Sequence, residues 1–157
     1  MNSDVQTLYL DSCGANVNKL ESFIERICDE MNIYNEYFSN ITTSIVSLYE
    51  SVCAHSEMQG SLKVDFYNDS NGLNFLFYID NEALMQELQS VLWDRSSILE
   101  DEKYDWLFIL DRLCDNIRLL EEGILLQYDI KSINAELANV RVMFLKSYLI
   151  GEKVFNN

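Results

Sequence analysis

Apolar residues recur at steps of three and four positions in several stretches of the chain, which is the spacing of one face of a helix. In the first of these stretches, the residues with this spacing run from Val17 to Met31. The pattern predicts helices over 16–33, from Tyr34 or Ser39 to about Ser56, over 82–93, around Trp106 to Leu113, and from Ile133 to a stop at Gly151.

Two of these helices carry an apolar stripe that bears on the architecture. The stripe of the second helix consists of Ile41, Ile45, Leu48, Tyr49 and Val52. The stripe of the last helix consists of Ile133, Leu137, Val140, Phe144, Leu145 and Tyr148. Such a stripe either covers the protein's own sheet or binds a partner or a second copy, and the pattern alone leaves both alternatives open.

Strands are predicted where apolar and polar residues alternate, or where a short apolar run lies between turn residues. Residues 62–67 alternate strictly, Asp69–Gly72 has the composition of a hairpin turn, and 73–80 is apolar on both faces, as a central strand would be. The polar, acidic segment 96–105 is predicted to be a loop. Further strands are predicted over 5–11, 116–120 and 124–130.

The order of these elements is strand, helix, helix, two strands, helix, loop, helix, two strands, helix. It predicts an α/β (α+β) two-layer sandwich, with a mixed, mostly antiparallel sheet, helices on one face and an extra C-terminal helix. The length of 157 residues suits one core. We expect residues 1–131 to form the sandwich and residues 132–157 to form a helical extension, packed on it or on a partner.

The charge balance restricts the partners. The chain has 26 Asp and Glu against 11 Lys and Arg, for a formal net charge of −15. Such a surface repels phosphate backbones and anionic lipids, so nucleic acid and membranes are poor partners and a basic protein face is a better one. The alternative is that the excess acid only keeps the protein in solution.

Cysteine spacing indicates neither a zinc site nor a disulfide framework, because Cys13, Cys28, Cys53 and Cys114 are far apart and form no paired motif. We therefore expect buried free thiols in a reducing compartment. The first residues have no signal-peptide character, and no apolar run reaches the length of a membrane span. These observations predict a cytoplasmic protein.

Four segments, in this order, resemble a known family. The first is NVNKLESFIERICDEMNI, and the second is the following helix, which carries Glu50. The third is LNFLFYID, and the fourth is WLFILDRLCDNIRLLEEGILLQYDI. Over about residues 5–130 they are similar to the histidine-kinase-like (GHKL) ATPases, in particular to their branch of anti-sigma-factor serine kinases. Each segment is a weak match by itself, and the order and spacing of the four carry the resemblance.

The resemblance implies a role for Glu50, because the family has a glutamate on its second helix that orients or deprotonates a reacting group. Four residues later the family has an asparagine that binds Mg²⁺, and here that position is Ala54, whose methyl group offers no oxygen to a metal. A histidine is common four residues further on in the branch, and here Met58 takes that place, while His55 is out of register. Glu50 is either a vestige of the catalytic residue or a solvated helix carboxylate.

The adenine-binding motif of the family is Asp-x-Gly-x-Gly. Asp80 matches its aspartate, but Glu82 and Leu84 replace the glycines. The alternative role of Asp80 is to cap the following helix. A second glycine motif, which holds phosphate, is replaced by Tyr104, Asp105 and Trp106, and we expect the bulky Tyr104, Trp106 and Met58 to plug the former nucleotide pocket. The resemblance thus implies a lost ATP site, with no cofactor and no metal.

Three functions remain after this comparison. The first is a non-catalytic regulator of the anti-sigma-factor type, which binds a sigma factor, an anti-sigma antagonist or a response-regulator-like domain and forms a homodimer. The second is a divergent ATP-binding serine/threonine protein kinase, with Glu50 as base and Asp80 as adenine anchor. In the third, the resemblance is accidental and the chain is an unrelated α+β interaction domain.

Overall fold

The computed structural model of the chain describes residues 5–10, 16–33, 35–54, 62–69, 72–129 and 135–149. Within these residues, one five-stranded sheet has the strand order β1-β2-β3-β5-β4, and every neighbouring pair is antiparallel. Its strands are β1 (Gln6–Leu10), β2 (Leu62–Asn68), β3 (Gly72–Tyr78), β4 (Asn116–Leu119) and β5 (Gly123–Asp129).

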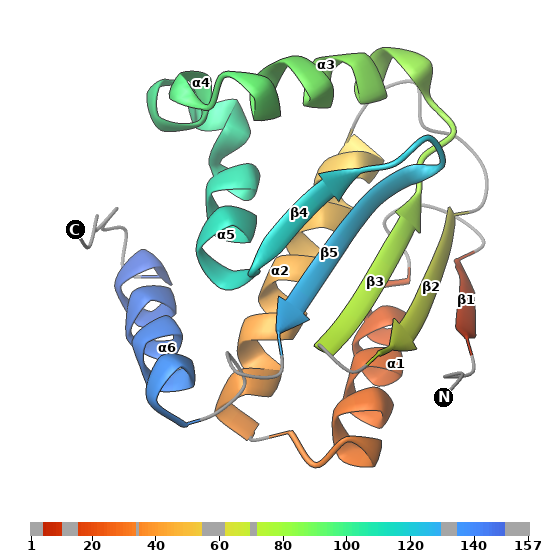
Figure 1. Cartoon of the computed structure of the whole chain (residues 1–157), viewed down its shortest axis with the longest axis vertical. Coiled ribbons are helices and arrows are strands. Elements are labelled where there is room, and N and C mark those ends of the chain that lie inside the picture. Colours follow the sequence, from red (N-terminus) through yellow and green to blue (C-terminus); the bar gives the residue numbers. More distant parts are fainter. Residues whose placement is uncertain are drawn as a thin grey trace.

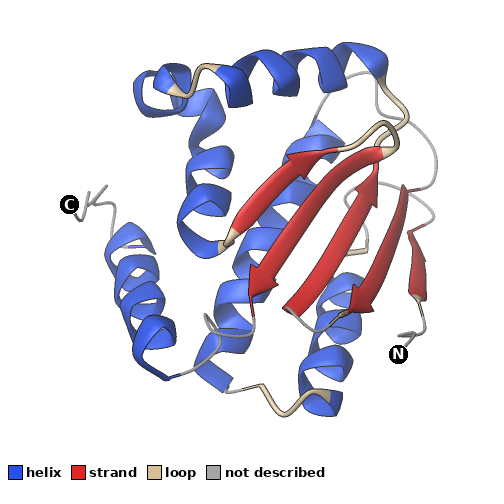
Figure 2. Ribbon diagram, viewed as in Figure 1, coloured by secondary structure: helices blue, strands red, loops and turns tan. Residues whose placement is uncertain are grey.

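The helices lie on one side of this sheet and around its β4 edge. Figures 1 and 2 show α1 and α2 behind the sheet, α3 across one end of it, and α5 and α6 on the left, beyond β4. The helices are α1 (Val17–Glu30), α2 (Asn35–Ala54), α3 (Glu82–Trp93), α4 (Ser96–Glu100), α5 (Asp105–Leu113) and α6 (Ala135–Leu149), with the 3-10 turn η1 (Glu102–Tyr104) before α5. The predicted two-layer α+β sandwich is confirmed, and the sheet of the described residues is antiparallel throughout rather than mixed.

The core lies between the sheet and the helices α1, α2 and α5. The predicted stripe of α2 is fully buried, as is the helix-facing row of β3, which includes Phe75 and Phe77. Phe75 meets Tyr128 of β5 edge to face, with ring centroids 5.9 Å apart. β3 is the central strand, as its apolar composition predicts, because it pairs with β2 on one side and β5 on the other.

The other face of the sheet is closed by its own polar side chains. Asp65 of β2 accepts hydrogen bonds from Thr7 Oγ1 at 2.6 Å and from Tyr78 OH at 2.7 Å, and the bond to Asp65 is the main reason that the pKa of Tyr78 is raised to about 12. A second row of hydrogen bonds crosses three strands through Asn116, Gln127 and Asn74. The apolar side chains in the middle of this face, Leu76 and Leu125, are buried.

The predicted loop at 96–105 is wrong, because short helices form there. The side chain of Asp94 accepts hydrogen bonds from the backbone and the hydroxyl of Ser96, which starts α4. The side chain of Asp101 accepts from the backbone N–H of Lys103, which starts η1. Ile98 is buried and fixes α4 to the core. Of the acidic residues in the predicted loop, Asp101 therefore acts as a helix cap, and Asp94, just before the segment, has the same role.

The predicted stripe of the last helix is correct at Phe144 and Leu145, which are buried, and wrong at Val140, which is 52% exposed. Arg141, only 9% exposed, is buried instead. α6 packs along α2 and also contacts α5. Ile133, the side chain of Leu137 and Gly151 lie outside the described residues.

The expectation for the cysteines is correct for two of them. Cys28 and Cys114 are buried free thiols, and burial is the main reason that both have their pKa raised to about 12. Cys53 is disulfide-bonded, so the expectation of a free thiol is wrong there. Cys13 lies outside the described residues.

Among the helices of the described part of the chain, none combines the length and the apolar character that a membrane span requires.

Candidate functional site

The two residues that the resemblance singles out are both in contact with solvent. Glu50 lies on α2, on the side opposite the buried stripe, and is exposed, as is Ala54 at the end of the same helix. Asp80 follows β3 and is exposed. His55 and Met58 lie outside the described residues. Glu50 is thus a solvated helix carboxylate in this structure.

The cap of α3 is Asn81 rather than Asp80. Asn81 has the extended backbone of an N-cap residue, and its side-chain Oδ1 accepts a hydrogen bond from the backbone N–H of Leu84 at 2.9 Å. The alternative that Asp80 caps this helix is therefore wrong, because the next residue, Asn81, is the cap. Asparagine is as good a cap as aspartate, so composition could not separate the two neighbours.

Replacing Asn81 with alanine is expected to lower the free energy of unfolding by about 1 kcal/mol, because the N–H of Leu84 loses its partner. The matched change Asp80→Ala is expected to shift it by less than about 0.5 kcal/mol. Urea unfolding followed by circular dichroism measures both. Equal losses for the two variants would contradict the assignment of the cap.

A pocket of about 310 Å³ lies between the end of α2, the middle of α3 and the start of α5. Neither Glu50 nor Asp80 lines it. Its walls consist of Ser51, Ala54, Leu84, Glu87, Leu88, Lys103, Tyr104 and Trp106.

The bulky residues that were expected to plug the former nucleotide site are part of this pocket. Tyr104 is buried and its hydroxyl donates to Glu87 Oε2 at 2.9 Å, while Trp106 is half-buried against the core. The two residues add to the core, as expected, but they leave the pocket open. Met58, the third residue of that expectation, is not among those described.

The helices that border this pocket are poorly suited to bind phosphate. A helix N-terminus attracts anions through its free N–H groups and its dipole. Here α3 has Glu82 in its first turn and the Asn81 side chain on one of its N–H groups, and α5 has Asp105 in its first turn. A phosphate at either helix start would therefore meet a carboxylate. No group of three or more His, Cys, Asp or Glu side chains among the described residues is arranged to hold a metal ion.

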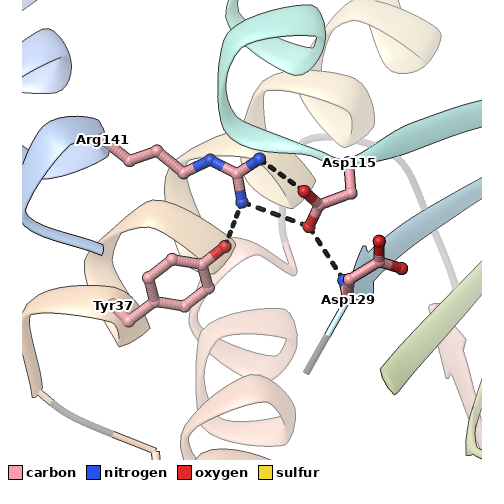
Figure 3. A network of polar contacts seen from close by, with 4 residues as sticks. All are labelled: Tyr37, Asp115, Asp129 and Arg141. Atoms are coloured by element: carbon pink, nitrogen blue, oxygen red, sulfur yellow. Dashed lines mark hydrogen bonds and ion pairs between the residues drawn. The ribbon is translucent and has the colours of Figure 1, made fainter. Parts of the chain in front are cut away.

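A largely buried ion pair lies elsewhere, at the junction of α6 with α2 and the sheet (Figure 3). Arg141 of α6 forms a two-pronged ion pair with Asp115, at 2.8 and 3.2 Å, and also donates to the hydroxyl of Tyr37 on α2. Asp115 accepts a further hydrogen bond from the backbone N–H of Asp129 at 2.8 Å. This network holds α6 to α2 and to the ends of β4 and β5.

The sequence contains one signal for this network. Arg141 is the only basic residue between Lys131 and Lys146, and it occupies a helical position that the apolar spacing would give to the core. Nothing in the pattern identifies Asp115 as its partner. Burial is the main cause of the pKa of Tyr37 being raised to about 12, against the opposing effect of Arg141. The contacts of Arg141 give the network a structural role, which is to attach α6 to α2 and to the sheet.

No protein-family model matches the chain, and a search of curated proteins of known function finds no significant match.

Proposed function

We propose that this protein is a non-catalytic regulator with a degenerate histidine-kinase-like ATPase domain of the anti-sigma-factor type, which acts by binding another protein. The observation that carries the proposal is the chemistry around the α2–α3–α5 pocket. α5 borders the pocket and has Asp105 in its first turn, and α2 presents Ala54 to the pocket where the family has a metal ligand. The other helix start, that of α3, carries Glu82 and lies outside the lining of this pocket. A carboxylate in the first turn of a helix opposes the binding of phosphate at that helix start.

The partner that we propose is a protein with a basic surface. The net charge of −15 favours association with such a surface through complementary fields and speeds the encounter. A sigma factor fits this description, because its DNA-binding face is basic and an acidic regulator could compete with DNA for it. An anti-sigma antagonist and a response-regulator-like domain are the other candidates, and we propose a homodimer as the regulatory form.

The proposed compartment is the cytoplasm. The free thiols Cys28 and Cys114 suit a reducing compartment, in which the disulfide of Cys53 would be cleaved to thiols.

Isothermal titration of the full chain with Mg-ATP tests the loss of the nucleotide site. No heat of binding is expected at micromolar protein concentrations. A low-micromolar Kd, together with ATP-dependent phosphotransfer to a partner protein that disappears in Glu50→Ala, would favour the divergent serine/threonine kinase instead. Asp80→Ala serves as the second variant in that case, because Asp80 would then anchor the adenine.

Inhibition of transcription tests the regulatory function itself. The full chain, added to RNA polymerase holoenzyme, is expected to lower transcription from promoters of the sigma factor that it binds, and to do so without ATP. Unchanged transcription with every sigma factor of the source organism would overturn the anti-sigma assignment.

A further inference from the structure

We propose that the outward face of α3, with the exposed Leu99 of α4 beside it, is the surface that docks a basic partner protein. The inference rests on the proposed function in one respect only, that the chain acts by binding a protein. The surface is defined here by Ala83, Gln86, Gln89, Ser90, Trp93 and Leu99, and is called the α3 surface.

The α3 surface has no charge, in a protein that is otherwise strongly charged. All of its residues on α3 are exposed, and from Ala83 to the end of the helix the one ionisable residue is Glu87, which is half-buried and bonded to Tyr104. The exposed positions of α1 provide the contrast, because they include Lys19, Glu25, Arg26, Asp29 and Glu30. Depletion of charge is the compositional mark of the centre of a protein interface.

The α3 surface also carries the most exposed tryptophan of the described residues. Trp93, the last residue of α3, is 92% exposed, and Leu99, on the following helix, is 55% exposed. An indole in water contributes nothing to the core and loses no packing when it is removed. Tryptophan is the residue type most enriched among binding hot spots, where its side chain fills a pocket of the partner.

A hollow lies along the same helix, before Trp93. It measures about 350 Å³ and lies between α3 and the turn that joins β4 to β5. Met85, Gln86 and Gln89 form one wall, and Leu119 and Leu120 form the other. Gln89 is four residues before Trp93, about 6 Å along the helix axis. A ridge and a hollow on one helix allow a partner to interlock in one orientation.

The rim of the α3 surface identifies the chemistry of the occupant. Glu82 and Glu121 stand at the hollow, and Asp94, Glu100 and Asp101 stand around the Trp93 end, all of them exposed. The two basic residues nearby are already paired, Arg95 with Asp111 at 2.5 Å and Lys103 with Glu87 at 3.9 Å. An apolar pocket framed by Lys and Arg complements this arrangement.

One other occupant and one other surface fit less well. A second copy of the chain would bring the same acidic rim against itself, and like charges at an interface cost affinity. The helix-free face of the sheet is a poorer docking surface than α3, because its polar groups already bond to one another through Asp65, Gln127 and their neighbours.

Site-specific photo-cross-linking in the cells of the source organism tests the proposal on the full chain. The photoreactive residue p-benzoylphenylalanine is placed at Gln86, in the centre of the α3 surface, and at Glu50, exposed on α2, as the control position. The expected result is an adduct with one basic protein, identified by mass spectrometry, from position 86 only. The same adduct is expected to disappear when Trp93→Ala is added.

The purified partner then gives the magnitude. Trp93→Ala is expected to weaken its binding at least 30-fold, about the loss typical of an interface hot spot. The matched variant Met143→Ala removes a side chain that is 70% exposed on α6 and is expected to leave the Kd unchanged. Both variants should keep the melting temperature of the parent, because neither side chain is buried.

Each outcome decides between the two proposals. The α3 surface is overturned if position 86 gives no adduct, or gives one with a second copy or with an acidic protein. It is also overturned if the Kd changes less than threefold in Trp93→Ala. A basic partner that depends on Trp93 but is neither a sigma factor nor one of its regulators supports the α3 surface and overturns the anti-sigma assignment. A sigma factor that binds Trp93→Ala as tightly as it binds the parent protein supports the anti-sigma assignment and overturns the α3 surface.

Discussion

Asp115→Ala is expected to lower the free energy of unfolding by about 3–5 kcal/mol, the range for breaking a buried ion pair from one side. The guanidinium of Arg141 would lose both of its hydrogen bonds to the carboxylate and would keep only Tyr37. It cannot escape to water easily, because its side chain is 10% exposed. The backbone N–H of Asp129 would lose its acceptor as well. Urea unfolding followed by circular dichroism measures the loss.

The expected loss of stability is large because the charges are buried, and not merely because they form an ion pair. Arg95–Asp111 has a shorter contact, 2.5 Å, but its side chains are 50% and 41% exposed. Solvent screens such a pair, so Arg95→Ala is expected to cost less than about 1 kcal/mol. Similar losses for Asp115→Ala and Arg95→Ala would contradict the assignment of Asp115 as a buried partner of Arg141.

A double variant separates the interaction from the cost of a stranded charge. Asp115→Leu combined with Arg141→Met removes both charges and replaces them with apolar side chains. The double variant is expected to lose less stability than Asp115→Ala alone, because no buried charge remains without a partner. α6 should then stay packed on α2 through Phe144 and Leu145, which are buried independently of the network.

Much of the fold could be predicted from the sequence, because the apolar spacing that gives a segment its local structure also gives it its buried face. The stripe of α2 and the alternation of β2 are the clearest cases, and both are buried as their spacing requires. The register of the central hairpin follows from the turn at Asp69 and Gly72, where the backbone N–H of Asp69 donates to Gly72 O at 3.0 Å.

The errors have one physical cause, which is that polar residues have alternative roles that spacing cannot separate. Asp94 and Asp101 are as common in loops as at helix caps, and only the backbone N–H groups within their reach decide which role they take. Arg141 is buried because Asp115 faces it from another element, and that meeting depends on the tertiary fold. The α3 surface, by contrast, is readable in the sequence as ALMQELQSVLW, whose outward positions lack charge once the helix is placed.

Glu50 and Asp80 show the limit of reasoning by resemblance. Both occupy the positions that the family would use, yet the structure leaves them in solvent, away from the pocket that Tyr104 and Trp106 border. Other residues line that pocket, so a matching position in the sequence did not place Glu50 or Asp80 in it. The features that distinguish this chain are the acidic helix starts and the uncharged face of α3, and neither belongs to the resemblance.

Gly123→Ala is expected to lower the free energy of unfolding by about 3 kcal/mol, through a clash between backbones. Gly123 begins β5 and lies opposite Tyr78 of β3. A Cβ at this position would lie 1.8 Å from the carbonyl oxygen and 2.9 Å from the carbonyl carbon of Phe77. Neither atom can turn away as a side chain would, so β3 and β5 would have to separate at this point.

The surrounding hydrogen bonds leave little room for that separation. The backbone N–H of Ile79 donates to Glu122 O at 3.0 Å, and that of Leu120 donates to Gly123 O at 2.8 Å. The turn is thereby fixed to both neighbouring strands, and the central pair β3–β5 carries the fully buried Phe77. Glu122→Ala, at an exposed position of the same turn, is the control and is expected to cost less than about 0.5 kcal/mol. Urea unfolding of the two variants measures the difference, and a loss below about 1 kcal/mol for Gly123→Ala would mean that the strands approach less closely here than the structure has them.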